Sequence, residues 1–264
     1  MQLATDKMLA RKDGAIGWMT FNNPARHNAL SYEMRLAALE ILEEFERDDH
    51  IRVIVMHGAG EKSFASGADI SQFDKMRATA EQQAEYERVS QAMQARLTSL
   101  SKPLIAMIRG YCIGGGLQTA LSADLRVASD DSQFGIPAGR LGIAYAWNSV
   151  AKLVETVGPS TAKHILLTAK RFPASDALRM GLVSQVVSPG ELESTVRELA
   201  QTIAGNAPLS LIAAKRAVDE LVKDPALRDA AGAMAAASRA MASEDFKEGR
   251  AAFMEKRKPV WKGR

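Results

Sequence analysis

The sequence has few cysteine, histidine and aromatic residues, and almost no excess of charge of one sign. Its 264 residues include one cysteine, Cys112, which excludes an internal disulfide, and four scattered histidines without the paired spacing of metal ligands. Aromatic residues make up 6%, and 34 basic against 31 acidic side chains leave a net charge of +3. This excess is too small to indicate a nucleic acid or an acidic membrane as partner. We therefore expect no metal site and no nucleic-acid surface.

The chain also lacks long apolar runs. No uncharged apolar stretch approaches the roughly 18 residues that cross a bilayer, and the first residues lack the order of a signal peptide. We expect a cytoplasmic protein without a membrane partner. Hydrophobic residues nevertheless make up 47% of the chain, enough for one large core.

Apolar runs alternate with helical patterns along the first two thirds of the chain. An Asp-Gly pair at residues 13–14 predicts a hairpin, and Ser31 is the expected N-cap of a helix that reaches about Arg47. Buried parallel strands are predicted at Val53–Met56, Leu104–Ile108, Leu125–Ala128 and Leu182–Val187. A long helix is predicted at about residues 80–100. The pattern favours an α/β fold with right-handed crossovers.

The last third is helical in character. Helix starts are predicted at Pro208, Pro225 and Ser243. The alanine-rich stretch 229–242 has few large apolar side chains, so we expect it to pack against another subunit.

Two glycine-containing loops follow predicted strands, at residues 64–70 and 110–117. Ligands of open α/β sheets collect at the carboxyl ends of strands, so both loops are expected at one crevice. If Gly114-Gly115-Gly116 opens a helix, its free N–H groups favour a developing anion. The triplet fits neither the P-loop nor the dinucleotide fingerprint, although glycines at such a turn can also serve packing alone.

Several ordered motifs together resemble the enoyl-CoA hydratase/isomerase (crotonase) superfamily. They are Arg26-His27-Asn28-Ala29-Leu30, Phe64-Ala65-Ser66-Gly67-Ala68-Asp69-Ile70, Gly110 to Gly116, Asp124, Phe134-Gly135-Ile136-Pro137, Gly181-Leu182-Val183 and Phe253 to Lys258. The resemblance implies a crotonase-like spiral of ββα units over residues 1–200 and a helical C-terminal trimerisation region over residues 201–264. It also implies a homotrimer or a homohexamer.

The resemblance further implies an acyl-CoA thioester as substrate, with coenzyme A as part of that substrate and no separate cofactor. Its carbonyl oxygen would be held by the N–H groups of Ala68 and Gly115, an oxyanion hole. Contacts with the nucleotide end of CoA are implied for Arg26 and Ala29, with the adenine for Ser66 and Ile70, and from a neighbouring subunit for Phe253 and Lys256.

The sequence departs from the family pattern at the acid–base positions. Where hydratases of the family carry two glutamates, this chain has Gln118 and Ala138, and the aspartate of some isomerases aligns with Ala146. An amide and a methyl group cannot supply the proton transfers of hydration. The standard hydratase or isomerase mechanism is therefore not expected.

Residues 141–148 contain a Leu-Gly-x-x-Tyr pattern that is similar to methylmalonyl-CoA decarboxylase, although that enzyme has histidine at the position of Ala68. Tyr145 would orient a leaving carboxylate or relay a proton. Alternatively, Tyr145 and Trp147 only line an acyl pocket with Pro137 and Ala138. Three hypotheses stay open: an enolate-forming enzyme of the hydratase/isomerase family, a decarboxylase or related lyase, and a non-catalytic CoA-binding protein.

Overall fold

The structure, a computed structural model, describes residues 3–69, 72 and 78–264 and contains two sheets. The larger sheet has the strand order β1-β2-β3-β5-β7-β10. Its strands are β1 (Met8–Asp13), β2 (Ile16–Phe21), β3 (Val53–Gly58), β5 (Leu104–Ile108), β7 (Leu125–Ser129) and β10 (Gln185–Val187). β1 and β2 form the predicted antiparallel hairpin, and the other neighbours pair in parallel.

The smaller sheet has the order β4-β6-β8-β9 and consists of short strands that sequence patterns did not predict. They are β4 (Ser63–Ala65), β6 (Tyr111–Ile113), β8 (Gln133–Gly135) and β9 (Phe172–Pro173). Each of β3, β5 and β7 is followed by one short strand of this sheet and then by a helix. This repetition confirms the expected crotonase-like α/β spiral of ββα units.

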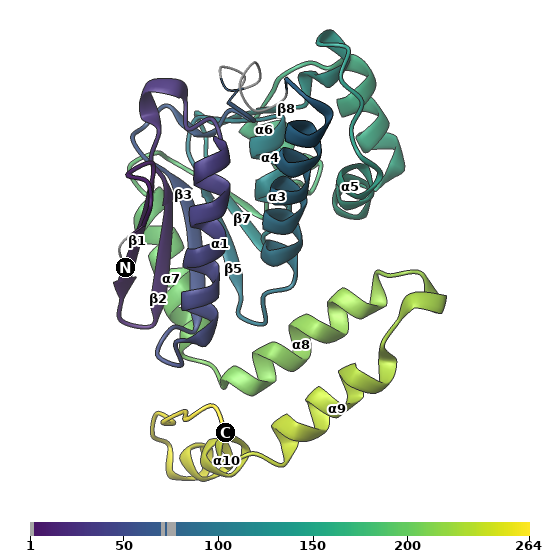
Figure 1. Cartoon of the computed structure of the whole chain (residues 1–264). Helices are drawn as coiled ribbons and strands as arrows, with labels where there is room; N and C mark the ends of the chain where they lie inside the picture. Colours follow the sequence, from purple (N-terminus) through teal and green to yellow (C-terminus); the bar gives the residue numbers. More distant parts are fainter. Residues whose placement is uncertain (1–2, 70–71, 73–77) are drawn as a thin grey trace.

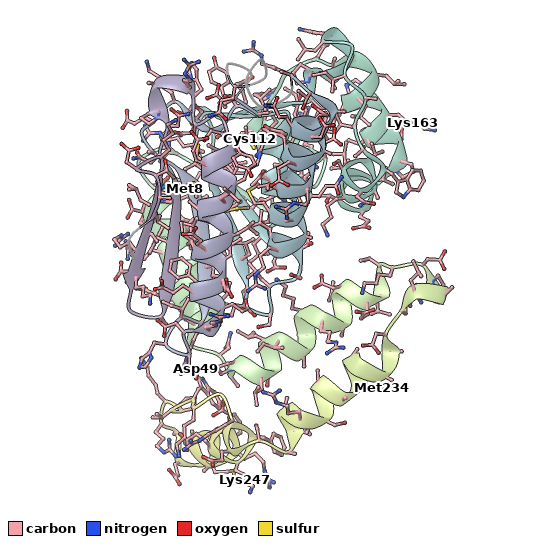
Figure 2. All side chains as sticks on the ribbon, in the orientation of Figure 1. Met8, Asp49, Cys112, Lys163, Met234 and Lys247 are labelled. Atoms are coloured by element: carbon pink, nitrogen blue, oxygen red, sulfur yellow. The ribbon has the colours of Figure 1, made fainter. Side chains whose placement is uncertain are left out.

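Helices cover both faces of the larger sheet (Figure 1). The helices are η1 (Pro24–Arg26), α1 (Tyr32–Arg47), α3 (Ala80–Thr98), α4 (Gly115–Leu121), η3 (Pro137–Arg140), α5 (Trp147–Thr168), α6 (Ala174–Arg179), α7 (Leu192–Ala204), α8 (Pro208–Leu221), η4 (Pro225–Leu227), α9 (Ala230–Met241) and α10 (Glu244–Glu255). Ser31 caps α1 as predicted, because its hydroxyl accepts a hydrogen bond from the Met34 N–H at 3.3 Å. Cys112 is buried in the hydrophobic core of the chain (Figure 2).

The expected division between residues 200 and 201 falls within α7. Val196 and Ala200 of this helix are buried in a cluster with Trp18 and Val55 of the sheet. The layered core therefore continues to the end of α7, and only the helices from α8 onward stand apart from the sheets (Figure 1).

The C-terminal helices extend away from the two sheets (Figure 1). Met234 lies on α9 and Lys247 on α10 (Figure 2). The helix start predicted at Pro225 is corrected: this proline opens only the short η4, and α9 begins at Ala230 after the Asp229 cap. α9 buries none of its residues. Among the described residues, no helix is both long and apolar enough to cross a membrane.

Candidate active site

Ala68 lies three residues after the end of the small-sheet strand β4, in a loop that pairs with Leu30. The Leu30 N–H donates to the Gly67 carbonyl at 2.7 Å, and the Asp69 N–H donates to the Leu30 carbonyl at 3.1 Å. In a parallel bridge of this kind the intervening residue turns its own N–H to the opposite side. The Ala68 N–H is thus directed away from Leu30.

Gly115 is the first residue of α4, and only the N-cap Gly114 separates it from the small-sheet strand β6. The first N–H groups of a helix have no partner within it, so the Gly115 N–H has no acceptor inside α4. Gly114, the N-cap, has φ +56° and ψ −121°, a conformation that strongly favours glycine. The glycine triplet therefore opens a helix as predicted.

The two loops meet because β4 and β6 are neighbours in the small sheet. A Cβ built on Gly115 would lie 3.6 Å from the Ala68 nitrogen, and one built on Gly67 would lie 3.5 Å from the Gly115 nitrogen. The structure thus brings the two loops together, and a shared ligand crevice between them stays a prediction. The loops follow β4 and β6, however, and not the longer β3 and β5.

Asn28 holds the first loop in place. Its buried side-chain amide donates to the carbonyls of Ala59 at 3.0 Å and Ser63 at 2.7 Å, and its oxygen accepts the Asn23 N–H at 2.9 Å. Asn28 also has φ +54°, which asparagine tolerates better than most residues. One side chain thereby fixes the strand that leads to Ala68.

We expect Asn28→Ala to lower the free energy of unfolding by about 3 kcal/mol, since three buried or half-buried backbone groups lose their hydrogen-bond partner. Urea unfolding followed by circular dichroism measures this loss. Asn22→Ala is the control, because the Asn22 amide makes only an exposed bond to the Asp6 carbonyl. Equal effects of the two substitutions would contradict the role of Asn28.

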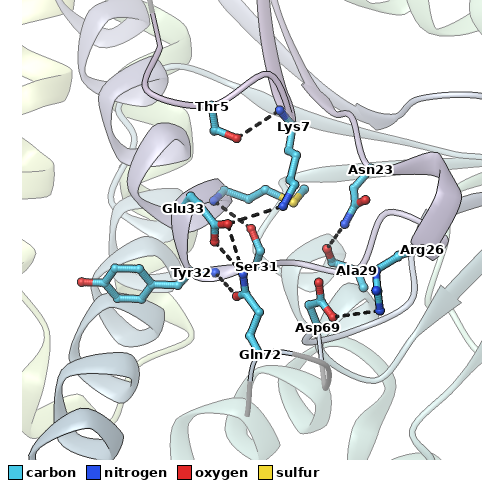
Figure 3. Close-up of polar contacts among 11 residues, drawn as sticks. Thr5, Lys7, Asn23, Arg26, Ala29, Ser31, Tyr32, Glu33, Asp69 and Gln72 are labelled. Atoms are coloured by element: carbon cyan, nitrogen blue, oxygen red, sulfur yellow. Dashed lines mark hydrogen bonds and ion pairs between the residues drawn. The ribbon is translucent and has the colours of Figure 1, made fainter. Parts of the chain in front are cut away.

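The structure brings the predicted CoA contacts Arg26, Ala29 and Ser66 close to Ala68. The Ser66 hydroxyl donates to the Arg26 carbonyl at 3.3 Å, and the Arg26 guanidinium lies 3.9 Å from the Asp69 carboxylate (Figure 3). The Asn23 amide donates to the Ala29 carbonyl at 3.1 Å in the same view. Ile70, the other predicted adenine contact, lies outside the described residues.

Tyr145 stands beside the start of α4. Its hydroxyl oxygen would lie 3.6 Å from a Cβ built on Gly114, the residue before Gly115. Burial raises the pKa of the Tyr145 hydroxyl to about 12, so this group stays protonated at neutral pH. It can therefore donate a hydrogen bond to a ligand next to Gly115.

Comparison with known proteins identifies this arrangement. A sequence profile described as "Enoyl-CoA hydratase/isomerase" matches residues 11–264. The chain belongs to the enoyl-CoA hydratase/isomerase family. It is 34% identical to a short-chain-enoyl-CoA hydratase of Clostridium acetobutylicum over 253 residues, with 96% of each chain covered. It is 36% identical to a carnitinyl-CoA dehydratase of Escherichia coli K12 over 260 residues, covering 96% of this chain and 97% of the relative.

Solved structures of the family agree with the fold. A crystal structure of an enoyl-CoA hydratase/carnithine racemase from Magnetospirillum magneticum has a TM-score of 0.93 at 33% identity, covering 99% of this chain and 97% of that one. An enoyl-CoA hydratase from Bacillus anthracis has a TM-score of 0.89 at 28% identity, covering 98% and 100%. The chain is accordingly an enzyme of this family.

This chain has Gln118 and Ala138 at the two positions where a hydratase of this family is expected to carry glutamates. The Gln118 amide, on α4, donates a hydrogen bond to the hydroxyl of Ser149 on α5. Ala138 lies in η3 and packs against the core with Tyr145. Neither side chain has a carboxylate.

Two further residues were predicted to line the acyl pocket, Pro137 and Trp147. Pro137 lies in η3 next to Ala138. Trp147, predicted to line the acyl pocket, is 83% exposed at the start of α5, so the described residues of this chain do not enclose it. Its exposure follows from its place at a helix start that follows an exposed loop.

Phe253 and Lys256 lie in and just after α10, at the opposite end of the molecule from α4 (Figure 1). Phe253 is 82% exposed. Neither residue reaches the site of its own chain, and a contact from a neighbouring subunit stays a prediction.

Sequence reasoning did not assign a role to Ser149 or to Asn28. Ser149 is 31 residues from Gln118 in the sequence, and the two meet only because α4 packs against α5. No pattern of neighbouring residues could therefore have predicted this contact. Asn28 was visible within a motif, but its three partners are set by the fold.

Proposed function

We propose that this enzyme acts on an acyl-CoA thioester and uses the N–H groups of Ala68 and Gly115 to stabilise a CoA enolate. The observation that supports the proposal is the close approach of the two loops, since a Cβ built on Gly115 would lie 3.6 Å from the Ala68 nitrogen. Preorganised backbone donors at a developing oxyanion are each worth about 3 kcal/mol of activation free energy. The names of the relatives, a hydratase and a dehydratase of CoA esters, support the same substrate class.

Hydration is not the reaction we propose. Adding water to an enoyl thioester needs a base for the water and an acid for the α-carbon. Gln118 and Ala138 supply neither, and the Gln118 amide is already engaged with Ser149.

Decarboxylation is the second candidate, favoured by the position of Tyr145. Loss of CO₂ leaves the bond's electron pair on the α-carbon, and the enolate oxygen is then held by the two N–H groups. No carboxylate base is required. The Tyr145 hydroxyl, whose pKa burial raises further above neutral pH, would orient the departing carboxylate or relay a proton.

Assays with crotonyl-CoA and with methylmalonyl-CoA, following thioester absorbance and CO₂ release, test the proposal. Hydration of crotonyl-CoA at the rate of ordinary family hydratases would contradict our assignment of Gln118 and Ala138. Tight binding of CoA without turnover of any thioester would instead support a non-catalytic CoA-binding protein.

For the decarboxylase candidate, we expect Tyr145→Phe to lower kcat about 100-fold, because the only proposed proton-donating side chain is lost. Tyr32→Phe serves as the control, since the Tyr32 hydroxyl bonds to Glu85 at 2.9 Å and not to the site. CO₂ release from methylmalonyl-CoA measures both variants. Unchanged turnover in Tyr145→Phe would refute the role of this hydroxyl.

A further inference from the structure

The segment that carries Tyr145 lies mostly at the surface. Of residues 139–148, every one except Tyr145 is exposed, and Tyr145 itself packs against the hydrophobic core. The backbone hydrogen bonds of the segment are local, since the N–H groups of Leu141 and Ile143 both donate to the Ala138 carbonyl. The segment therefore has little buried surface of its own to fix the place of Tyr145.

The first turn of α5, which follows Tyr145, has no side-chain cap. Its N-cap is Ala146, whose methyl group cannot accept a hydrogen bond, whereas serine, threonine, asparagine or aspartate is usual at this position. The Ala146 carbonyl accepts the N–H groups of Ser149 at 3.0 Å and Val150 at 3.2 Å. The turn is thus formed, but without the side-chain contact that commonly secures it.

One hydrogen bond joins this turn to α4. The Gln118 amide donates to the hydroxyl of Ser149, a residue only 9% exposed. Within the described part of the chain, no other hydrogen bond or ion pair joins residues 139–149 to an element outside η3 and α5. The bond from Gln118 is therefore the polar contact that holds the start of α5 against α4.

Gln118 lies on the same face of α4 as Gly114. The Gln118 N–H donates to the Gly114 carbonyl at 3.0 Å, so the two residues are one helical turn apart. The Tyr145 hydroxyl would lie 3.6 Å from a Cβ built on Gly114, and Ser149, four residues after Tyr145, meets Gln118. The chain from Tyr145 to Ser149 therefore runs along this face of α4.

The Tyr145 hydroxyl has no hydrogen-bond partner of its own among the described residues. Burial is the sole cause that raises its pKa, so no charged group of the described chain acts on it. Its place is accordingly set by the packing of the ring and by the position of the backbone that leads into α5.

We propose that Gln118 is a positioning residue for Tyr145: by holding Ser149, it keeps the Tyr145 hydroxyl next to Gly115. This inference rests on the proposed function, in which that hydroxyl acts on a departing carboxylate. An amide nitrogen can donate to the Ser149 hydroxyl, whereas an ionised carboxylate only accepts. Position 118 thus has a role in this chain that needs no carboxylate.

Hydrogen exchange of the full-length protein, measured by mass spectrometry, tests the positioning directly. Gln118→Met removes the amide from a side chain of similar length, and the Ser149 and Val150 N–H groups should then exchange about fivefold faster, as expected for one lost hydrogen bond. Exchange at the wild-type rate in Gln118→Met would mean that this bond does not hold the segment, and the proposal would be wrong.

Two comparisons separate this effect from a general loss of packing. Ser149→Val should exchange as fast as Gln118→Met, whereas Ser149→Thr, which differs from the valine variant by its hydroxyl, should stay close to wild type. Gln94→Met is the matched control, because Gln94 is also a half-buried helical glutamine and its amide donates to Thr119 of α4 at 3.1 Å. Faster exchange of the same N–H groups in Gln94→Met would contradict a specific role of Gln118.

Kinetics show whether Gln118 acts through Tyr145. We expect Gln118→Met to lower kcat for CO₂ release from methylmalonyl-CoA about fivefold with KM unchanged, and Gln94→Met to change neither. In a protein that already carries Tyr145→Phe, Gln118→Met should have no further effect, since the hydroxyl that it positions is gone. A further fivefold loss in that background would overturn the proposal.

The two measurements also separate this proposal from the proposed function. Wild-type protein that releases no CO₂ from methylmalonyl-CoA would refute the decarboxylase candidate. The exchange rates of Gln118→Met and its controls would then decide by themselves whether Gln118 positions the segment of Tyr145.

Discussion

Replacing Gly115 by proline is expected to lower kcat about 100- to 1000-fold relative to Gly115→Ala, because it removes one proposed oxyanion donor. Proline is tolerated at the first position of a helix, where the N–H has no intrahelical partner. Gly115 occupies that position in α4. The substitution thus removes the donor and leaves the helical hydrogen bonds intact.

Gly115→Ala is the matched control because it keeps the N–H. Its new methyl group meets Gly67 Cα at 3.5 Å and the Ala68 nitrogen at 3.6 Å, which are ordinary contact distances. Turnover of methylmalonyl-CoA and thermal unfolding of both variants give the comparison. If Gly115→Pro and Gly115→Ala have the same kcat, the Gly115 N–H is not an oxyanion donor.

Replacing the next residue, Gly116, by alanine should instead act on stability. A Cβ on Gly116 would lie 2.0 Å from the Ala65 carbonyl oxygen and 2.6 Å from its carbon. Both are backbone atoms, so α4 and β4 must separate to make room. We expect a loss of about 3 kcal/mol, as for severe overpacking of a core.

Differential scanning calorimetry of Gly116→Ala should show a Tm about 6–12 °C below wild type, given roughly 2–4 °C per kcal/mol for a chain of this size. Gly115→Ala, one residue earlier, should stay within a few degrees of wild type. A Gly116→Ala protein as stable as Gly115→Ala would mean that the contact between α4 and β4 is looser than described.

Local signals account for much of the fold. The Asp-Gly hairpin, the Ser31 cap and the buried strands at Val53 and Leu104 were all predicted, because each depends on neighbours in the sequence. The strands of the small sheet were not, since a strand of two or three residues has too few side chains for an alternating pattern. The helix start predicted at Pro225 was wrong because proline favours the first turn of any helix, including one as short as η4.

The candidate site also has some features that the sequence indicated and others that it did not. The sequence indicated the loops of Ala68 and Gly115 and the loss of carboxylates at Gln118 and Ala138, because motif positions are fixed along the chain. It did not place Tyr145 beside Gly114 or pair Gln118 with Ser149. Those contacts join residues about 30 apart through the packing of α4 against α5 and its preceding loop.

The sequence by itself thus determined the α/β class, the family resemblance, both loops and the absence of the hydratase carboxylates. Only the tertiary structure decided that β4 and β6 are neighbours, that the loops of Ala68 and Gly115 lie close together, and that Lys170 and Arg171 line a pocket with Ser66. The physical reason is that residue type and spacing fix local conformation. Convergence of distant backbone groups depends on strand pairing and close packing across the whole core.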